Sequence, residues 1–114
     1  MKYALLIYPG ETLEQVERLP EEERQSVVEE YLALTREPGV LGAAQLHPPE
    51  HTTTVRAENG TTLTTDGPFA DTKEILGGLY LLEADNLDVA LDVAARIPAL
   101  RFGGAVEVRP LVER

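Results

Sequence analysis

The residues best suited to chemistry begin at Asp66, in a polar segment that leads into the apolar stretch Ile75–Leu82. The carboxylate of Asp66 can act as a general base or orient a substrate, and Lys73 beside Glu74 can bind an anion or lower the pKa of an acid. A loop that feeds a buried strand commonly carries binding and catalytic groups. The structural alternatives are that Asp66 caps its own turn and that the loop charges form solvated ion pairs.

Two histidines and one arginine are the other candidates. His47 and His51 are separated by two prolines, so they cannot share a helical face in the way that zinc proteases require. His47, next to a strand end, can serve as a general base, although an exposed loop histidine is the plainer interpretation. The guanidinium group of Arg101 can bind a carboxylate or a phosphate. We predict Asp66 as the catalytic residue, and the predicted substrate-binding residues are Lys73, Glu74, Arg101 and His47.

Residue types that the chain lacks exclude several kinds of site. There is no cysteine, which removes disulfides, thiolate nucleophiles and cysteine-ligated metals together. Ser26 is the only serine and falls within a predicted helix, so no serine-based triad is credible. Gly103-Gly104 lacks the spacing of a dinucleotide fingerprint or of a phosphate loop. We predict neither a metal site nor a cofactor.

The totals describe one small acidic domain. The 114 residues predict a single domain over 1–114, and the formal net charge is -10. Such a surface repels phosphate backbones and anionic lipid, which argues against nucleic-acid and membrane partners. No apolar run approaches the ~18 residues of a membrane span, and the N-terminal run is too short for a signal peptide. We therefore expect a cytoplasmic protein.

The pattern of apolar and turn residues predicts five strand regions. Asn59-Gly60 is the strongest short hairpin signal, and the threonine-rich arms beside it predict a peripheral, half-exposed hairpin. The predicted strands are Lys2–Tyr8, Val40–Leu46, the hairpin arms Thr52–Ala57 and Thr61–Thr65, Ile75–Ala84 and Ala105–Arg109.

Helices are predicted between these strands. Thr12 and Gln15 form a capping box for a first short helix, and Pro20 begins a second. A third helix runs from Leu87 to about Ile97, with Asp92 and Arg96 spaced as an ion pair on its outer side. The inward residues predicted for the second helix are Val27, Val28, Tyr31, Leu32 and Thr35; those for the third are Leu87, Ala90, Leu91, Ala94 and Ala95.

The order of the elements predicts an assembly. The strand-helix-strand halves match the split βαβ ferredoxin-like plan with a hairpin inserted between them. Right-handed crossovers place the helices on one face of the sheet. Lys2–Tyr8 and Leu79–Leu82 are nevertheless apolar on both faces, and an uncovered apolar face marks an interface. We therefore predict a two-fold homodimer that packs sheet to sheet.

Five segments together resemble the YCII-related, DGPF-motif family. They are KYALLIY at the start, TTTVR at 52–56, TDGPFADTKE at 65–74, LGGLYLLEA at 76–84 and AARIPALRFGGAVEVRP at 94–110. The DGPF-x-x-TKE block is the specific part, and the match covers nearly the whole chain. The resemblance implies a ferredoxin-like α+β fold and a dimer of the dimeric α/β barrel type. It also implies relatives that stand alone or are joined to extracytoplasmic-type sigma factors, with functions generally unassigned.

The resemblance bears on the site residue by residue. The wider group has a proposed histidine–aspartate pair whose histidine belongs on the long helix, and residues 27–31 contain none. Asp66, within the DGPF motif, is the residue that the resemblance supports, with Lys73 and Glu74 beside it. His47 does not occupy the place of that histidine.

Two functions from different classes follow. The first is a dimer that binds a small molecule in a cleft near Asp66, as a cofactor-independent lyase, isomerase or hydrolase. The second is a non-catalytic regulatory or interaction module that acts with a sigma factor or a related transcription partner. An enclosed Asp66 carboxylate favours the first function, and an open turn capped by Asp66 favours the second.

Overall fold

The computed structural model describes residues 1–69 and 74–114. Antiparallel strands with helices packed on them make this an α+β protein, and the predicted strand regions are all present with small changes at their ends. The elements are β1 (Lys2–Tyr8), α1 (Thr12–Glu17), α2 (Glu21–Thr35), β2 (Val40–Gln45), the 3₁₀ turn η1 (Pro49–His51), β3 (Thr53–Glu58), β4 (Thr61–Asp66), β5 (Gly78–Glu83), α3 (Leu87–Ala94), the 3₁₀ turn η2 (Pro98–Phe102) and β6 (Ala105–Pro110).

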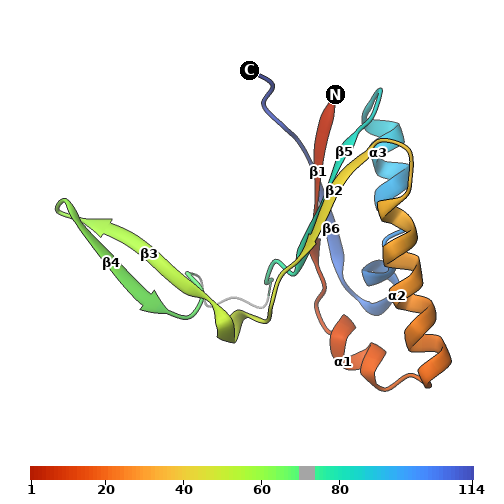
Figure 1. The fold of residues 1–114 in the computed structure, drawn as a ribbon, viewed down its shortest axis with the longest axis horizontal. Helices are drawn as coiled ribbons and strands as arrows, with labels where there is room; N and C mark the ends of the chain where they lie inside the picture. The colour runs from red at the N-terminus through yellow and green to blue at the C-terminus, as the bar shows by residue number, and fades with distance from the viewer. Residues whose placement is uncertain (70–73) are drawn as a thin grey trace.

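The main sheet has four strands in the order β2-β5-β1-β6, and every neighbouring pair is antiparallel. With β3 and β4 set aside, this is the order expected of two interleaved strand-helix-strand units, as in ferredoxin-like folds. Figure 1 shows the helices on one side of this sheet only. The sequence-based fold class is therefore supported at the level of a single chain.

The two faces of the sheet differ in burial. On β1, Tyr3, Leu5 and Ile7 are buried beneath the helices, whereas Leu6 and Tyr8 point to the other side and are half-buried. Strand alternation places successive side chains on opposite faces, so every second residue of β1 meets the helices. The core comprises Tyr3, Leu5, Ile7, Leu34, Tyr80, Leu82, Ala84, Ala90, Val93, Ala94, Ile97 and Ala99.

The second face of the sheet is apolar over its two central strands. Ala4 lies opposite Leu81, and Leu6 lies opposite Leu79, so these four side chains share one patch. Leu6, Leu79 and Leu81 are only half-buried, because no helix of the described residues covers them. We call this surface the open face. Its apolar character was the basis of the predicted dimer.

The inward residues predicted for the two long helices were partly wrong. On α2, Val27 and Leu34 are buried, but Val28 and Leu32 are 54% and 51% exposed. Val27, Tyr31 and Leu34 follow the spacing of one helix face, and that face meets the sheet. Val28 and Leu32 each lie one position further round the helix, and they therefore face solvent.

Helix α3 shows the same rotation of its inner face. Ala90, Val93 and Ala94 are buried, whereas Leu87 and Leu91 are 48% and 46% exposed. Small alanine side chains let the helix approach the sheet closely. The predicted set put the larger leucines inside, which was wrong because shape at the contact outweighed the hydrophobicity of single residues. Ala95, also predicted to be inward, is exposed.

Two predicted local interactions are replaced by tertiary ones. Thr12 does not form a capping box: its hydroxyl donates to the Pro9 carbonyl, and the Gln15 amide donates to the Phe102 carbonyl at 3.2 Å. Arg96 donates to the Glu37 carboxylate at 2.7 Å, rather than to the Asp92 carboxylate. This hydrogen bond from Arg96 lowers the pKa of Glu37. The Gln15–Phe102 and Arg96–Glu37 contacts join segments that are far apart in sequence, whereas the Thr12–Pro9 contact is local.

The core tyrosine Tyr80 predicts a loss of stability at high pH. Its hydroxyl donates to the Tyr31 carbonyl at 2.8 Å, and burial, with the Tyr31 side chain adding a smaller effect, raises the pKa of Tyr80 to about 12. Between the ordinary value of 10.0 and about 12, the unfolded chain ionises this hydroxyl while the folded chain keeps it neutral. We expect the free energy of unfolding to fall as pH rises through that window, in urea titrations. Tyr80→Phe should have a flatter pH profile, and an equally steep profile would contradict this assignment.

Strands β3 and β4 form a hairpin that stands away from the rest of the chain (Figure 1). Asn59 and Gly60 have φ angles of 50° and 80°, as the predicted two-residue turn requires. The two strands pair only with each other, and every residue of β4 is exposed. We call Thr53–Asp66 the arm. It accounts for a radius of gyration of 16.1 Å, where a compact chain of this length has about 13 Å.

The helices of the described residues are all too short or too polar to cross a membrane.

Candidate functional site

One end of the sheet brings together the ends of all its strands and the base of the arm. The main-chain amide of Leu46, just after β2, donates to the Gly77 carbonyl at 2.9 Å, and the Gly77 amide donates to the Ile7 carbonyl at 2.8 Å. A Cβ on Gly77 would lie 2.7 Å from Pro9 Cδ, so only glycine permits this close approach. The arm is therefore fastened to the sheet where β1 ends at Tyr8. We call this region the arm end.

Asp66 is the last residue of the arm, and its carboxylate is exposed. The turn that follows is closed by other groups: the Gly67 amide donates to the Thr52 carbonyl, and the Thr54 hydroxyl donates to the Gly67 carbonyl, both at 2.7 Å. Within residues 1–69 and 74–114, no hydrogen bond or ion pair engages the Asp66 carboxylate. Among these residues, the Asp66 carboxylate therefore does not cap its own turn.

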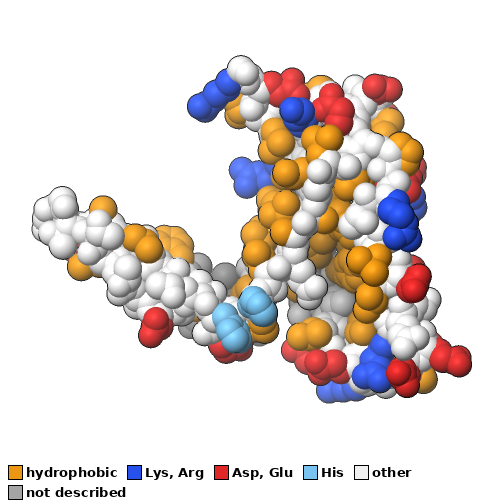
Figure 2. Space-filling view, in the orientation of Figure 1, with side chains coloured by type: hydrophobic (Ala, Val, Ile, Leu, Met, Phe, Trp, Pro, Cys, Tyr) orange, Lys and Arg blue, Asp and Glu red, His pale blue; other side chains and the backbone are white. Residues whose placement is uncertain are grey.

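His47 and His51 lie together at the base of the arm, where Figure 2 shows both as adjacent pale blue side chains. Their ring centroids are 5.2 Å apart with 29° between the ring planes, because η1 turns the chain back between them. Both side chains are exposed. Among the described residues, no group of three or more histidine, aspartate or glutamate side chains is placed to hold a metal ion.

A polar pair occupies the arm end of the open face. The Tyr8 hydroxyl donates to the Glu107 carboxylate at 2.9 Å, linking β1 to β6. This hydrogen bond, together with the negative charges of Glu107 and Glu74, raises the pKa of the Tyr8 hydroxyl, and the Arg109 charge opposes the shift. Because the single hydroxyl proton of Tyr8 is donated to Glu107, the Tyr8 oxygen can accept a hydrogen bond from a substrate. Glu74 and Arg109 are within electrostatic range of the same hydroxyl.

Sequence reasoning missed the Tyr8–Glu107 pair, because 99 positions separate the two residues. The alternation of charged and apolar residues in β6 was the only signal, since it placed Glu107 and Arg109 on one face. Among the predicted binding residues, Glu74 is the one that the structure brings near this pair. The predicted residue Lys73 lies outside the described residues.

Arg101 does not belong to the arm end. Its guanidinium donates to the Glu30 carboxylate on α2, with Nη1 3.0 Å from Oε1. It lines a shallow groove between α2 and the segment 95–101 after α3, together with Arg96, Glu37 and Leu100. The helix layer therefore separates Arg101 from the open face, and the structure does not group it with Asp66 or His47.

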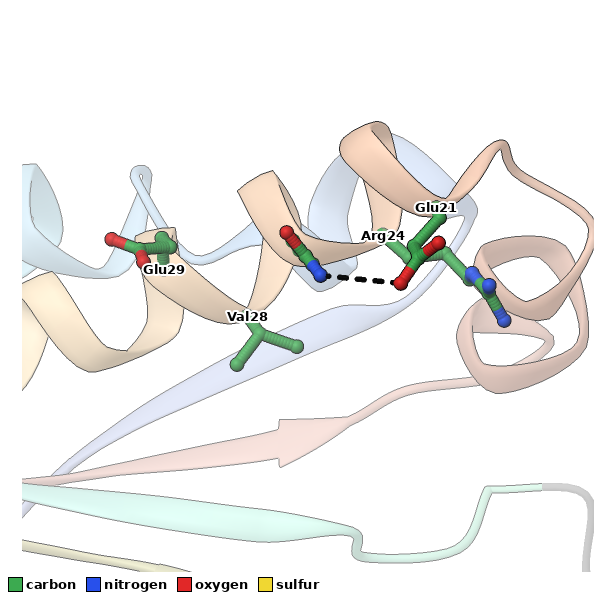
Figure 3. Close-up of a pocket in the computed structure, with 5 residues that line it drawn as sticks. Glu21, Arg24, Val28 and Glu29 are labelled. Carbon is green, nitrogen blue, oxygen red and sulfur yellow. Dashed lines mark hydrogen bonds between the residues drawn. The ribbon is translucent and has the colours of Figure 1, made fainter.

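A second shallow hollow lies on the outer surface of α2, as the close-up in Figure 3 shows. Glu21, Arg24, Val28 and Glu29 project from one helix there, and the Gln25 amide donates to Glu21 at 3.5 Å. All of its lining residues come from a single helix. This arrangement is typical of a solvated helix surface rather than of an enclosed ligand site.

Comparison with known proteins agrees with this architecture. The model of the YCII-related domain family matches residues 1–114. The chain belongs to the YCII-related domain family. An uncharacterised protein of Rhizobium meliloti (strain 1021) is 41% identical over 116 residues, which cover 97% of this chain and 92% of that protein. The resemblance to the YCII-related family is therefore confirmed, and the similar protein of Rhizobium meliloti is described as uncharacterised.

Proposed function

We propose that this YCII-related protein is a homodimer whose copies pack open face to open face and that it binds a small molecule at the arm end. The observation that carries the proposal is the open face itself. Leu6, Leu79 and Leu81 form an apolar surface that the chain's own helices leave uncovered, and the Tyr8–Glu107 pair lies at one end of it. A second copy would shelter the leucines and enclose the polar pair.

The groups at the arm end suit a small polar ligand. Tyr8 and Glu107 offer oxygens that can accept hydrogen bonds, and Arg109 offers a charge that attracts anions. Asp66 offers a carboxylate that the described residues leave available as a base or as an orienting group. An available carboxylate that takes up a proton from a bound ligand would suit proton transfer without a cofactor, as in a lyase, isomerase or hydrolase reaction.

Asp66→Asn tests the role of this carboxylate. Because other groups close the turn, we expect the free energy of unfolding to change by no more than about 0.5 kcal/mol, as at an ordinary surface position. A metabolite thermal-shift screen of the unaltered protein would first identify stabilising compounds. We expect Asp66→Asn and Tyr8→Phe each to lose that stabilisation, while Glu22→Gln on α2 retains it. Unchanged ligand binding with reduced stability would instead assign Asp66 to the turn.

The second candidate is a non-catalytic regulatory or interaction module. Such a module would act with a sigma factor or a related transcription protein. The exposure of Asp66 in the single chain favours it, because an isolated surface carboxylate is poorly placed for catalysis. A screen in which no metabolite stabilises the dimer would support this module over the ligand-binding site.

A further inference from the structure

The arm has the surface of a segment that is covered in its functional state. Val55 is 63% exposed, Leu63 is 42% exposed, and Phe69 beyond the arm is 71% exposed. Arg56 lies opposite Leu63 in the hairpin, and its guanidinium lies 4.5 Å from the centre of the Phe69 ring. Both surfaces of the hairpin thus carry apolar groups, although an isolated two-stranded hairpin is at best marginally stable in water.

The size of the open face indicates that the arm takes part in the dimer. Four strands of about six residues give a flat footprint of roughly 400 Å² at ordinary strand spacings. A stable interface buries about 800 Å² on each partner. Although accessible area exceeds a flat footprint, the open face by itself is smaller than a standard interface. The arm is the largest further surface on the same side of the sheet (Figure 1).

The reach of the arm matches this role. Its strands of six residues extend for about 20 Å, whereas two packed sheets lie only about 10 Å apart. A second copy on the open face therefore lies beside the arm, and the arm passes the edge of the partner's sheet. The edges of each sheet are β2, from which the arm departs, and β6.

We propose that the arm of each copy passes the β6 edge of its partner, and that the base of the arm, where Asp66 lies opposite Thr53, is next to the partner's Tyr8 and the partner's Glu107. This rests on the proposed dimer and deepens it, because each ligand site then contains residues from both copies. A two-fold axis parallel to the strands produces this arrangement. Such a rotation leaves both arm ends at the same end of the dimer and places β2 of one copy opposite the β6 edge of the other.

This placement of the arm explains why Asp66 and the β6 edge are both exposed in the single chain. Asp66 is exposed and without a partner among the described residues of its own chain, because its neighbours lie on the other copy. The β6 edge, which carries exposed Glu107 and Arg109, is an unpaired strand edge, and the partner's arm covers it. The site would take a small anionic or hydrogen-bonding molecule held between Asp66 and the Tyr8–Glu107 pair.

Cross-linking between copies tests the proposal, and the absence of native cysteines makes each introduced cysteine unique. One chain would carry Thr65→Cys in the arm, and a second, differently tagged chain would carry Ala105→Cys at the start of β6. The chains are mixed, allowed to exchange, and treated with a short bismaleimide. The matched control replaces Ala105→Cys by Glu22→Cys, which is exposed on α2 in the helix layer.

We expect at least roughly tenfold more covalent heterodimer from the 65–105 mixture than from the 65–22 control, because proximity raises the effective concentration. A dimer that yields equal cross-linking in both mixtures would overturn the placement of the arm but leave the proposed dimer intact. A protein that is monomeric at micromolar concentration would overturn both. The two failures are distinguished by measuring the molar mass of the same samples before cross-linking.

Discussion

Leu81→Arg should convert the protein from a dimer to a folded monomer. Leu81 lies at the centre of the open face, opposite Ala4 on one side and Gly42 on the other. In the proposed dimer, the new guanidinium would be buried between two sheets without a partner, which costs several kcal/mol. Two such charges face each other in the two-fold interface. We expect the dimer dissociation constant to rise by at least about a hundredfold, which corresponds to roughly 3 kcal/mol.

Light scattering with size-exclusion chromatography measures this change directly. The control is Val28→Arg, because Val28 is an exposed apolar residue of the helix layer and not of the open face. We expect that variant to remain dimeric. Circular dichroism of Leu81→Arg should retain the helical signal, since the substituted side chain faces water in the single chain. A dimeric Leu81→Arg protein would refute sheet-to-sheet packing.

Leu5→Ala should cause the largest loss of stability among single core truncations that we consider. Leu5 is 0% exposed, and it lies on the face of β1 that the helices cover, next to Tyr80 of β5 and Val108 of β6. Removing a fully buried leucine side chain costs about 2–5 kcal/mol, because the cavity closes only in part. Urea unfolding should show this loss as a lower midpoint, and the loss should be the same at every protein concentration.

Leu6→Ala is the matched control, since it makes the same chemical change on the next residue of the same strand. Leu6 belongs to the open face. We expect its truncation to reduce stability mainly through the dimer, so that the loss disappears at protein concentrations low enough to dissociate both the variant and the unaltered dimer. Equal, concentration-independent losses for both variants would indicate that the open face is not an interface.

Much of the fold was evident from local patterns. The hairpin at Asn59-Gly60 needs two residues that accept positive φ, and no other segment offers such a pair between threonine-rich arms. The order of the elements, with right-handed crossovers, predicted that the chain's own helices cover only one side of its sheet. These features are periodic or confined to adjacent residues, so a linear pattern contains them.

Tertiary contacts decided the details of the helices. Leu32 and Leu91 are as hydrophobic as Leu34, yet they are exposed, because the direction in which each helix crosses the sheet selects the inner residues. Arg96 forms its ion pair with Glu37 rather than with the carboxylate of Asp92, which is four residues away in sequence. Local spacing makes such a pair available but does not decide between it and a partner on another element.

The candidate site shows the same division. Asp66 could be identified as a candidate from its turn and its motif. That its carboxylate is not needed to close the turn could not, because Thr52 and Thr54 make the hydrogen bonds to Gly67 instead. The Tyr8–Glu107 hydrogen bond joins opposite ends of the chain, and only the pairing register of β1 with β6 makes the two residues neighbours. Side chains that are distant in sequence meet through sheet topology, which is a property of the assembled fold and not of any segment within it.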